Sequence, residues 1–198
     1  MNPSARATFT TVRALSSSQR ERRERLLAAA RELATAGGYP AVTMHEVADR
    51  AQVARATVYR YFSSKDQLLT AVGAQWARAA TDAVPAQRAT GGAAATMAAA
   101  LGAIIDRTGA DLPLTSAVVL AVISGDPTAE REREELYAFM LARFDVLIGD
   151  DLAPPDREQV GYLLGHLLLA AFTSMCTMNQ SAELVRGMLT GAARRLLP

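Results

Sequence analysis

Two arginines, two tyrosines and a threonine fall within one short stretch of the chain, residues 55–61. If this stretch is helical, its outward side chains are those of Arg55, Ala56, Thr57, Tyr59, Arg60 and Tyr61. A guanidinium group can bind the edge of guanine through two hydrogen bonds, which discriminates against a wrong base by about 1–3 kcal/mol. Threonine and tyrosine hydroxyls can bind phosphate oxygens without reading the sequence. These residue types indicate binding to double-stranded DNA.

Neighbouring helices must position these side chains. Thr43 and Glu46 have the spacing of a capping box, which predicts a short helix from there to about Ala51. A tight turn at residues 52–54 and the helix 55–61 would complete a helix-turn-helix. A longer helix at residues 18–36 is expected to cover its back. Lys65 then begins the next helix, beside the expected DNA surface.

The segment from Thr43 to Lys65, TMHEVADRAQVARATVYRYFSSK, is followed by Leu68 and Leu69. It resembles the DNA-binding domain of the TetR family, and the specific part is the run from Thr57 to Phe62 with Lys65 just after it. Residues 19–25, 37–39 and 59–62 also look like those of KstR-type repressors of steroid catabolism, although many relatives with other ligands share these pieces.

The resemblance implies a role for each position of this segment. Thr43 would contact a phosphate at the start of its helix. Contacts to bases or to the sugar edge would come from Arg55, Ala56, Tyr59 and Arg60. Contacts to the DNA backbone would come from Thr57, Tyr61 and Lys65. The sequence departs from the family pattern at Gln52, where glycine is usual, and at Ala54, where serine is frequent.

The distribution of charge supports a nucleic-acid partner for one end of the chain. Up to Gln75 there are eleven Arg or Lys against six Asp or Glu, and from Trp76 onward there are ten against fourteen. A basic first third suits a polyanion, although ordinary scatter of surface charge is an alternative for a difference of this size. The single cysteine, Cys176, excludes an internal disulfide and a cysteine-built zinc site.

The rest of the chain has helical periodicity and no alternating strand pattern. We therefore expect an all-α fold of about nine helices, with a flexible basic arm at residues 1–17. A three-helix DNA-binding domain would occupy residues 18–64. A helical domain for ligand binding and dimerisation would occupy residues 65–198.

An apolar stretch with sparse polar points predicts a site for a small, lipophilic effector, because such sites combine apolar walls with a few placed polar groups. The candidate lining residues are Met97, Thr115, Ser116, Tyr137, Met140, His166 and Thr173. Each of these residues has an ordinary alternative as part of the hydrophobic core.

The last two helices predict a partner, because residues 160–175 are apolar nearly all round. Together with a symmetry mate they would form a four-helix dimer interface. The candidate interface residues are Gly161, Leu164, Gly165, Leu168, Leu184, Met188, Leu189 and Ala192. Burial of both helices within one chain is the alternative.

These features together predict a homodimeric repressor that binds a palindromic operator and is released by its effector. An activator or a ligand-blind DNA-binding protein has the same sequence features. An all-α enzyme is a poorer fit, since no paired-histidine metal motif or phosphate-binding glycine loop is present. We expect no cofactor, no metal and no membrane association, and a location in the cytoplasm.

Overall fold

The computed structural model describes residues 17–82 and 90–198, and these contain nine α-helices, two short 3-10 helices and no strand. The predicted all-α fold of about nine helices is confirmed. The basic arm expected at residues 1–17 lies outside the described residues except for Ser17. The fourth helix was expected to end near Pro85, which also lies outside them.

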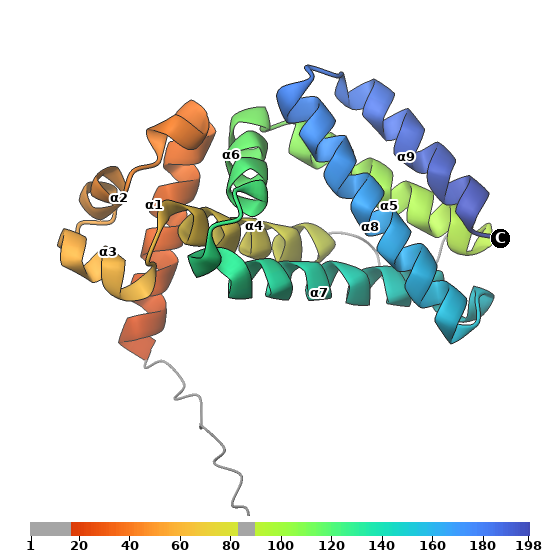
Figure 1. Ribbon diagram of the computed structural model, residues 1–198, viewed down its shortest axis with the longest axis horizontal. Helices are drawn as coiled ribbons and strands as arrows, with labels where there is room; N and C mark the ends of the chain where they lie inside the picture. Colours follow the sequence, from red (N-terminus) through yellow and green to blue (C-terminus); the bar gives the residue numbers. More distant parts are fainter. Residues whose placement is uncertain (1–16, 83–89) are drawn as a thin grey trace, which may run out of the picture.

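Three helices form a group at one end of the molecule (Figure 1). They are α1 (Ser17–Ala41), α2 (Met44–Arg50) and α3 (Arg55–Tyr61). Helical geometry in α1 is interrupted at Gly37 and Gly38, where we expected the first helix to stop. Gly38 has φ of 66° and ψ of −160°, a conformation open to glycine alone. This break redirects the chain toward α2.

The remaining helices extend away from this group (Figure 1). They are α4 (Lys65–Asp82), α5 (Gly92–Gly109), α6 (Leu112–Ile123), α7 (Glu130–Ile148), α8 (Pro154–Thr177) and α9 (Ala182–Leu196). The 3-10 turns η1 (Pro127–Ala129) and η2 (Gly149–Asp151) flank α7. Asp111 caps α6 by accepting a hydrogen bond from the Leu114 amide at 3.1 Å.

Two separate hydrophobic cores hold these helices together. The first combines α1, α2, α3, α4 and α6, with Leu26, Val47, Val58 and Leu114 each fully buried. The second combines α5, α7, α8 and α9. Helix α6 follows α5 in sequence but packs in the first core. Together with α4, it connects the helix-turn-helix to the rest of the molecule.

Candidate nucleic-acid interface and ligand cavity

Helix α2 begins at the capping threonine that the sequence predicts. The Oγ1 atom of Thr43 accepts a hydrogen bond from the Glu46 amide at 3.1 Å, and Thr43 has extended φ and ψ angles. Thr43 is exposed, and its hydroxyl hydrogen stays available because the capping bond uses only the oxygen. The hydroxyl can therefore donate to a phosphate at this helix start.

The turn between α2 and α3 contains both departures from the family pattern. Gln52 adopts φ of 54°, the left-handed conformation that glycine adopts at lower cost. Ala54 occupies the N-cap of α3 and offers no side-chain hydrogen bond. The turn is closed by backbone bonds instead, from Val53 to Ala48 at 3.0 Å and from Thr57 to Ala54 at 2.8 Å. The turn geometry is kept, at some cost in stability.

Replacing Ala54 with serine should stabilise the protein. A serine hydroxyl at this N-cap would accept one of the unpaired amide hydrogens of the first turn of α3, which raises the free energy of unfolding by about 1 kcal/mol. Chemical denaturation of the purified variant measures this value. The control is Ala28→Ser, in the exposed middle of α1, where serine is slightly less favourable than alanine. Equal effects of both substitutions would contradict the missing cap.

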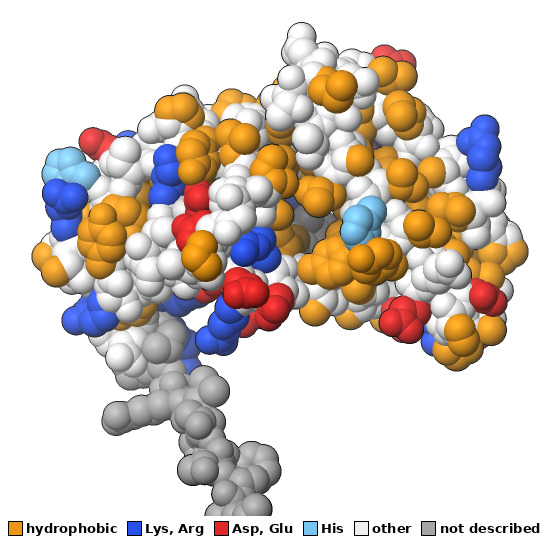
Figure 2. All heavy atoms as spheres, in the orientation of Figure 1, with side chains coloured by type: hydrophobic (Ala, Val, Ile, Leu, Met, Phe, Trp, Pro, Cys, Tyr) orange, Lys and Arg blue, Asp and Glu red, His pale blue; other side chains and the backbone are white. Residues whose placement is uncertain are grey.

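Helix α3 faces the core with one edge and solvent with the rest. Val58 is fully buried and Phe62, directly after the helix, is 1% exposed. These two anchors leave Arg55, Ala56, Tyr59 and Arg60 exposed on the outer side, with Tyr59 at 49%. Basic side chains gather around this end of the molecule on the face shown in Figure 2. The predicted base-reading residues thus share one accessible surface.

The expected backbone-contacting residues lie at the edge of this surface. Thr57, Tyr61 and Lys65 are each half-buried. The Tyr61 hydroxyl is buried and has no hydrogen-bond partner among the described residues. The guanidinium carbon of Arg60 lies 5.6 Å from the centre of the Tyr61 ring. Tyr61 thus combines a hydroxyl that no described residue uses with a neighbouring positive charge.

Lys65 is held in place by the segment that follows the α1 break. Its Nζ atom lies 3.6 Å from the centre of the Tyr39 ring and donates to the Tyr39 carbonyl at 3.4 Å. The Tyr39 hydroxyl donates to Asp66 Oδ1 at 2.7 Å. Burial, then the hydrogen bond to Asp66, raises the pKa of Tyr39 to about 12, so the phenol stays neutral and keeps donating. Sequence reasoning found Lys65 but not this support.

A cavity of about 590 Å³ lies between α4, α5, α6, α7 and α8. Its walls are mainly apolar, and the surface is hollowed between α6 and α8 (Figure 2). Four of the seven predicted lining residues border it, namely Thr115, Tyr137, Met140 and His166. The size and the apolar walls suit a drug-sized lipophilic molecule.

The other three predicted lining residues do not border the cavity. Met97 is fully buried in the second core. Ser116 forms a hydrogen bond with Cys176, and Thr173 donates to the Leu169 carbonyl of its own helix at 2.9 Å. Helical periodicity alone does not separate residues that fill a core from residues that line a void.

The cavity wall also contains charged side chains that sequence reasoning missed. Arg107, Arg133, Arg143 and Glu134 all border it. Arg143 forms no ion pair within the described residues, and its Nε atom is buried without a hydrogen-bond partner there. The sequence pattern around Arg133 and Glu134 indicated solvated helix charges, and no pattern singled out Arg107 or Arg143. In the fold these side chains give an apolar cavity a net positive wall, which favours a ligand with an anionic end.

Tyr137 and His166 form a polar group in this wall. The Tyr137 hydroxyl lies 3.4 Å from His166 Nδ1, which is also 2.9 Å from the Tyr162 carbonyl. Tyr162 and His166 pack with ring centres 4.3 Å apart. Burial raises the pKa of Tyr137, so its phenol stays a neutral hydrogen-bond donor toward the cavity.

The structure corrects our choice of interface residues on α8. Gly161, Leu164, Gly165 and Leu168 are buried within the chain. Gly161 and Gly165 face α7, where a Cβ on Gly165 would lie 2.5 Å from the Met140 methyl group. The glycines bring α7 and α8 together and do not face a partner. On α9, Leu189 is 4% exposed and Ala192 is half-buried, whereas Leu184 and Met188 are 51% and 61% exposed.

The opposite face of α8 is apolar and uncovered in the single chain. Its exposed members include Tyr162, Leu163 and Leu167. Among the described residues, α8 has the length and mean hydropathy, 1.5, of a membrane-spanning helix, and 33% of its apolar window is buried. Length and composition alone do not establish a membrane span, so our expectation of no membrane association stays a prediction. Core helices pass the same test, and α8 packs on α7 and α9.

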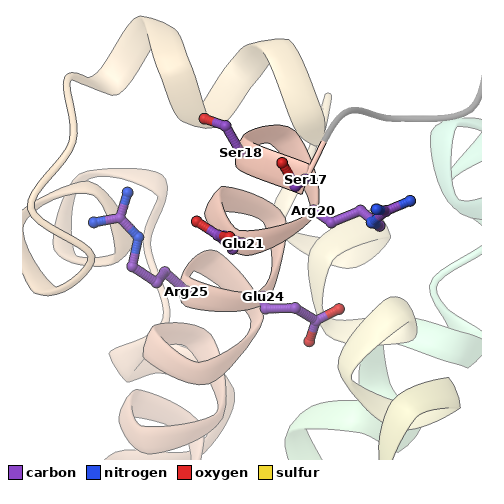
Figure 3. A pocket seen from close by; sticks show the side chains of 6 residues that line it. All are labelled: Ser17, Ser18, Arg20, Glu21, Glu24 and Arg25. Carbon is purple, nitrogen blue, oxygen red and sulfur yellow. The ribbon is translucent and has the colours of Figure 1, made fainter.

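A shallow hollow follows the first two turns of α1 and is lined by Ser17, Ser18, Arg20, Glu21, Glu24 and Arg25. In Figure 3 the labelled side chains point in different directions and do not converge on a common centre. We assign no ligand to this hollow. Within residues 17–82 and 90–198, no group of three His, Cys, Asp or Glu side chains is placed to hold a metal ion.

Comparison with known proteins identifies a matching family and similar sequences. The family described as "Bacterial regulatory proteins, tetR family" matches residues 26–72. The transcriptional repressor KstR of Mycobacterium tuberculosis is 33% identical, with 92% of this chain and 83% of that protein covered. KstR of Mycolicibacterium smegmatis is 32% identical over 92% of this chain and 90% of its own length.

Two solved structures share the fold. A TetR transcriptional regulator from Rhodococcus sp. RHA1 has a TM-score of 0.75 and 25% identity, with 91% of this chain and 98% of that chain covered. The regulator FadR of Bacillus subtilis, in complex with stearoyl-CoA, has a TM-score of 0.65 and covers 88% of this chain and 97% of its own, at 15% identity. The second likeness shows the fold alone.

Proposed function

The chain belongs to the TetR family of bacterial transcriptional regulators, and from this premise we propose that it is a homodimeric repressor released from its operator by a lipophilic effector. The observation that carries the proposal is the combination of an exposed basic recognition helix with a largely apolar cavity in the same chain. The relationship to KstR repressors supports repression over activation. Such a protein would act on DNA in the cytoplasm and would need no cofactor.

The proposed reader of the operator is helix α3. Arg55, Ala56, Tyr59 and Arg60 would face base edges in the major groove, because the anchoring of Val58 and Phe62 leaves them outside. Thr43, Thr57, Tyr61 and Lys65 would bind phosphates on either side. This division predicts that the first set determines sequence preference and the second set determines affinity for any DNA.

The proposed dimer interface is the uncovered face of α8 and α9. It consists of Leu163, Leu167, Ala170, Leu184 and Met188. These apolar side chains are exposed in the single chain, and a two-fold partner would bury them in a four-helix arrangement. A two-fold dimer presents two copies of α3, which matches the two half-sites of a palindrome.

The proposed effector is an apolar molecule with an anionic end. The cavity walls are apolar, while Arg107, Arg133 and Arg143 supply positive charge. FadR of Bacillus subtilis, which shares the fold, has been seen with stearoyl-CoA, a molecule of this type. Binding between α4, α6 and α7 would move α4, and this movement would change the separation of the two copies of α3. Effector and operator would then each weaken the binding of the other.

Effector titration on bound operator tests this proposal. Stearoyl-CoA, sodium oleate and progesterone would each be added to the protein bound to DNA that it selects from a random pool. We expect stearoyl-CoA or sodium oleate to weaken operator binding by about 5- to 150-fold, the usual range of allosteric coupling, and progesterone, which has no anionic end, to have a smaller effect. Fluorescence anisotropy of the labelled DNA measures the affinity.

The cavity provides the control for this titration. Val122 borders it, so Val122→Trp would fill it and should remove the effect of the active compound. Val146, which is 63% exposed on α7 and does not border it, allows the same type of substitution elsewhere. Val146→Trp should respond like the wild type. A response that survives in Val122→Trp, or no response to any of the three compounds, would count against effector release through this cavity.

A further inference from the structure

Hydrogen bonds join the first turn of α4 to η1 and to the first turn of α7. Ser64 Oγ lies 2.8 Å from Thr128 Oγ1, which is 2.9 Å from Asp126 Oδ1. The Nε2 atom of Gln67 donates to Glu132 Oε1 at 3.0 Å. We call Ser64, Gln67, Asp126, Thr128 and Glu132 the α4–α7 clasp. It joins two segments that are more than sixty residues apart in sequence.

On the α4 side, the clasp fixes the residues that carry the DNA contact. Ser64 Oγ caps α4 by accepting from the Gln67 amide at 3.0 Å, and Gln67 Oε1 accepts from the Ser63 amide at 2.6 Å. Lys65 and Asp66 lie between the two clasp residues and hold Tyr39 through the contacts described above. Any displacement of Ser64 and Gln67 would move Lys65 as well.

On the α7 side, the clasp reaches the cavity. The Nη1 atom of Arg133 donates to the Asp126 carbonyl at 2.8 Å, and Arg133 borders the cavity. Glu132 is followed in α7 by residues of the cavity wall, the first of them at positions 133, 134 and 136. A ligand that displaces the start of α7 would therefore act directly on both hydrogen-bonded connections to α4.

The hydrogen bonds of the clasp also leave one buried polar atom without a partner. The second carboxylate oxygen of Glu132 is buried and has no hydrogen-bond partner among the described residues. This unpaired oxygen lowers the net stability that the Gln67–Glu132 connection provides, because the oxygen has lost its water. Opening the connection would rehydrate this oxygen, which reduces the free energy that separates the closed from the open arrangement.

We infer that the α4–α7 clasp positions Lys65 for operator binding and that the effector releases DNA by opening it. This inference rests on the proposed function, since it assigns the residues through which the cavity acts on the DNA surface. Ser64, Gln67, Thr128 and Glu132 are positioning residues and need no contact with DNA or ligand. The closed clasp is the operator-binding arrangement.

A reversible covalent clasp tests this inference without any effector. Ser64→Cys and Thr128→Cys would be combined in a Cys176→Ser background, so that a disulfide within the chain can form only across the clasp, and gel filtration without reductant would remove chains linked to each other. Oxidised glutathione takes up the two electrons and two protons that the thiols lose, and dithiothreitol reverses the reaction. The hydroxyl oxygens that these sulfur atoms replace are 2.8 Å apart, which places the two side chains within bridging range.

We expect the reduced protein to bind its operator about tenfold more weakly than the Cys176→Ser parent, because the hydroxyl connections are lost. The oxidised protein should bind within about twofold of the parent. The salt dependence of binding adds a second readout that overall stability would not change. Loss of the Lys65 phosphate contact from both half-sites should reduce the slope of log K against log salt by about 2 in the reduced form.

Matched threonine variants distinguish the effect of opening the clasp from the effect of losing a hydroxyl group elsewhere. Thr128→Val should weaken operator binding and flatten the salt dependence like the reduced protein. Thr177→Val should change neither, since among the described residues that hydroxyl bonds only to the Thr173 carbonyl of its own helix. Equal operator affinity in the oxidised and reduced forms, or tighter binding by the reduced form, would overturn the inference about the clasp. Neither result would contradict the proposed function. If the wild type binds no specific DNA, the proposed function fails together with the inference.

Discussion

Loss of the Arg55 side chain should remove most of the specific DNA binding of this protein. One good arginine–guanine contact contributes about 1–3 kcal/mol of discrimination, and a two-fold dimer makes it in both half-sites. The Arg55→Ala dimer should therefore lose about 2–6 kcal/mol, or roughly 30-fold to more than 10,000-fold in operator affinity. Adding Tyr59→Ala should make specific binding undetectable.

Fluorescence anisotropy with the selected operator and with a scrambled duplex measures this loss. Binding to the scrambled duplex should fall much less, since phosphate contacts provide most non-specific affinity. The thermal stability should stay close to that of the wild type, because Arg55 and Tyr59 are exposed. The control is Arg194→Ala, which removes an exposed arginine from α9. Full operator affinity in the double variant would show that α3 is not the reading helix.

Charges placed on the uncovered face of α8 and α9 should have the second large effect. Leu167 and Met188 are 40% and 61% exposed in the single chain and would be buried in the proposed dimer. The Leu167→Asp, Met188→Asp protein should be a monomer, because a buried, unpaired carboxylate is strongly unfavourable. Linked half-sites typically raise affinity by about 10²–10⁴-fold over a single site, and a monomer loses this gain.

Sedimentation analysis measures the mass in solution, and anisotropy measures the operator affinity of the same sample. Val146→Asp serves as the matched control, because Val146 is 63% exposed but lies on α7 outside the proposed interface. That variant should remain a dimer with unchanged affinity. If the double variant is still a dimer, the dimer interface must lie elsewhere.

The DNA-binding segment could be predicted because its signals are local. The capping spacing of Thr43 with Glu46 requires only neighbouring residues, and the cap is present. The break in α1 at Gly38 could be predicted for the same reason. The contact between Lys65 and Tyr39 joins residues 26 positions apart, and no local pattern indicates it.

Helix α8 shows why the four interface residues predicted on it lie inside the chain. Its sequence is apolar on nearly every side, so periodicity does not tell which face packs inside the chain. Spacing favoured the face of Gly161 and Gly165, and the structure uses this face for close contact with α7. The outward face became visible only when the packing of α7 and α9 was known.

The cavity could be predicted in kind but not in detail. Apolar helices with sparse polar points indicated a lipophilic site, and four named residues border it. Arg107 and Arg143 were not identified, because a charged residue on a helix usually faces water. These arginines lie in the cavity wall only because five helices pack around the cavity.

Selection from a random pool of DNA duplexes tests the central claim most directly. The purified wild-type protein would be allowed to enrich its preferred sequences, and the enriched pool would be sequenced. We predict a two-fold symmetric motif with two half-sites, whose preferred bases change when Arg55→Ala is used instead. No enrichment over the starting pool, or a single asymmetric site unaffected by Arg55→Ala, would contradict the account.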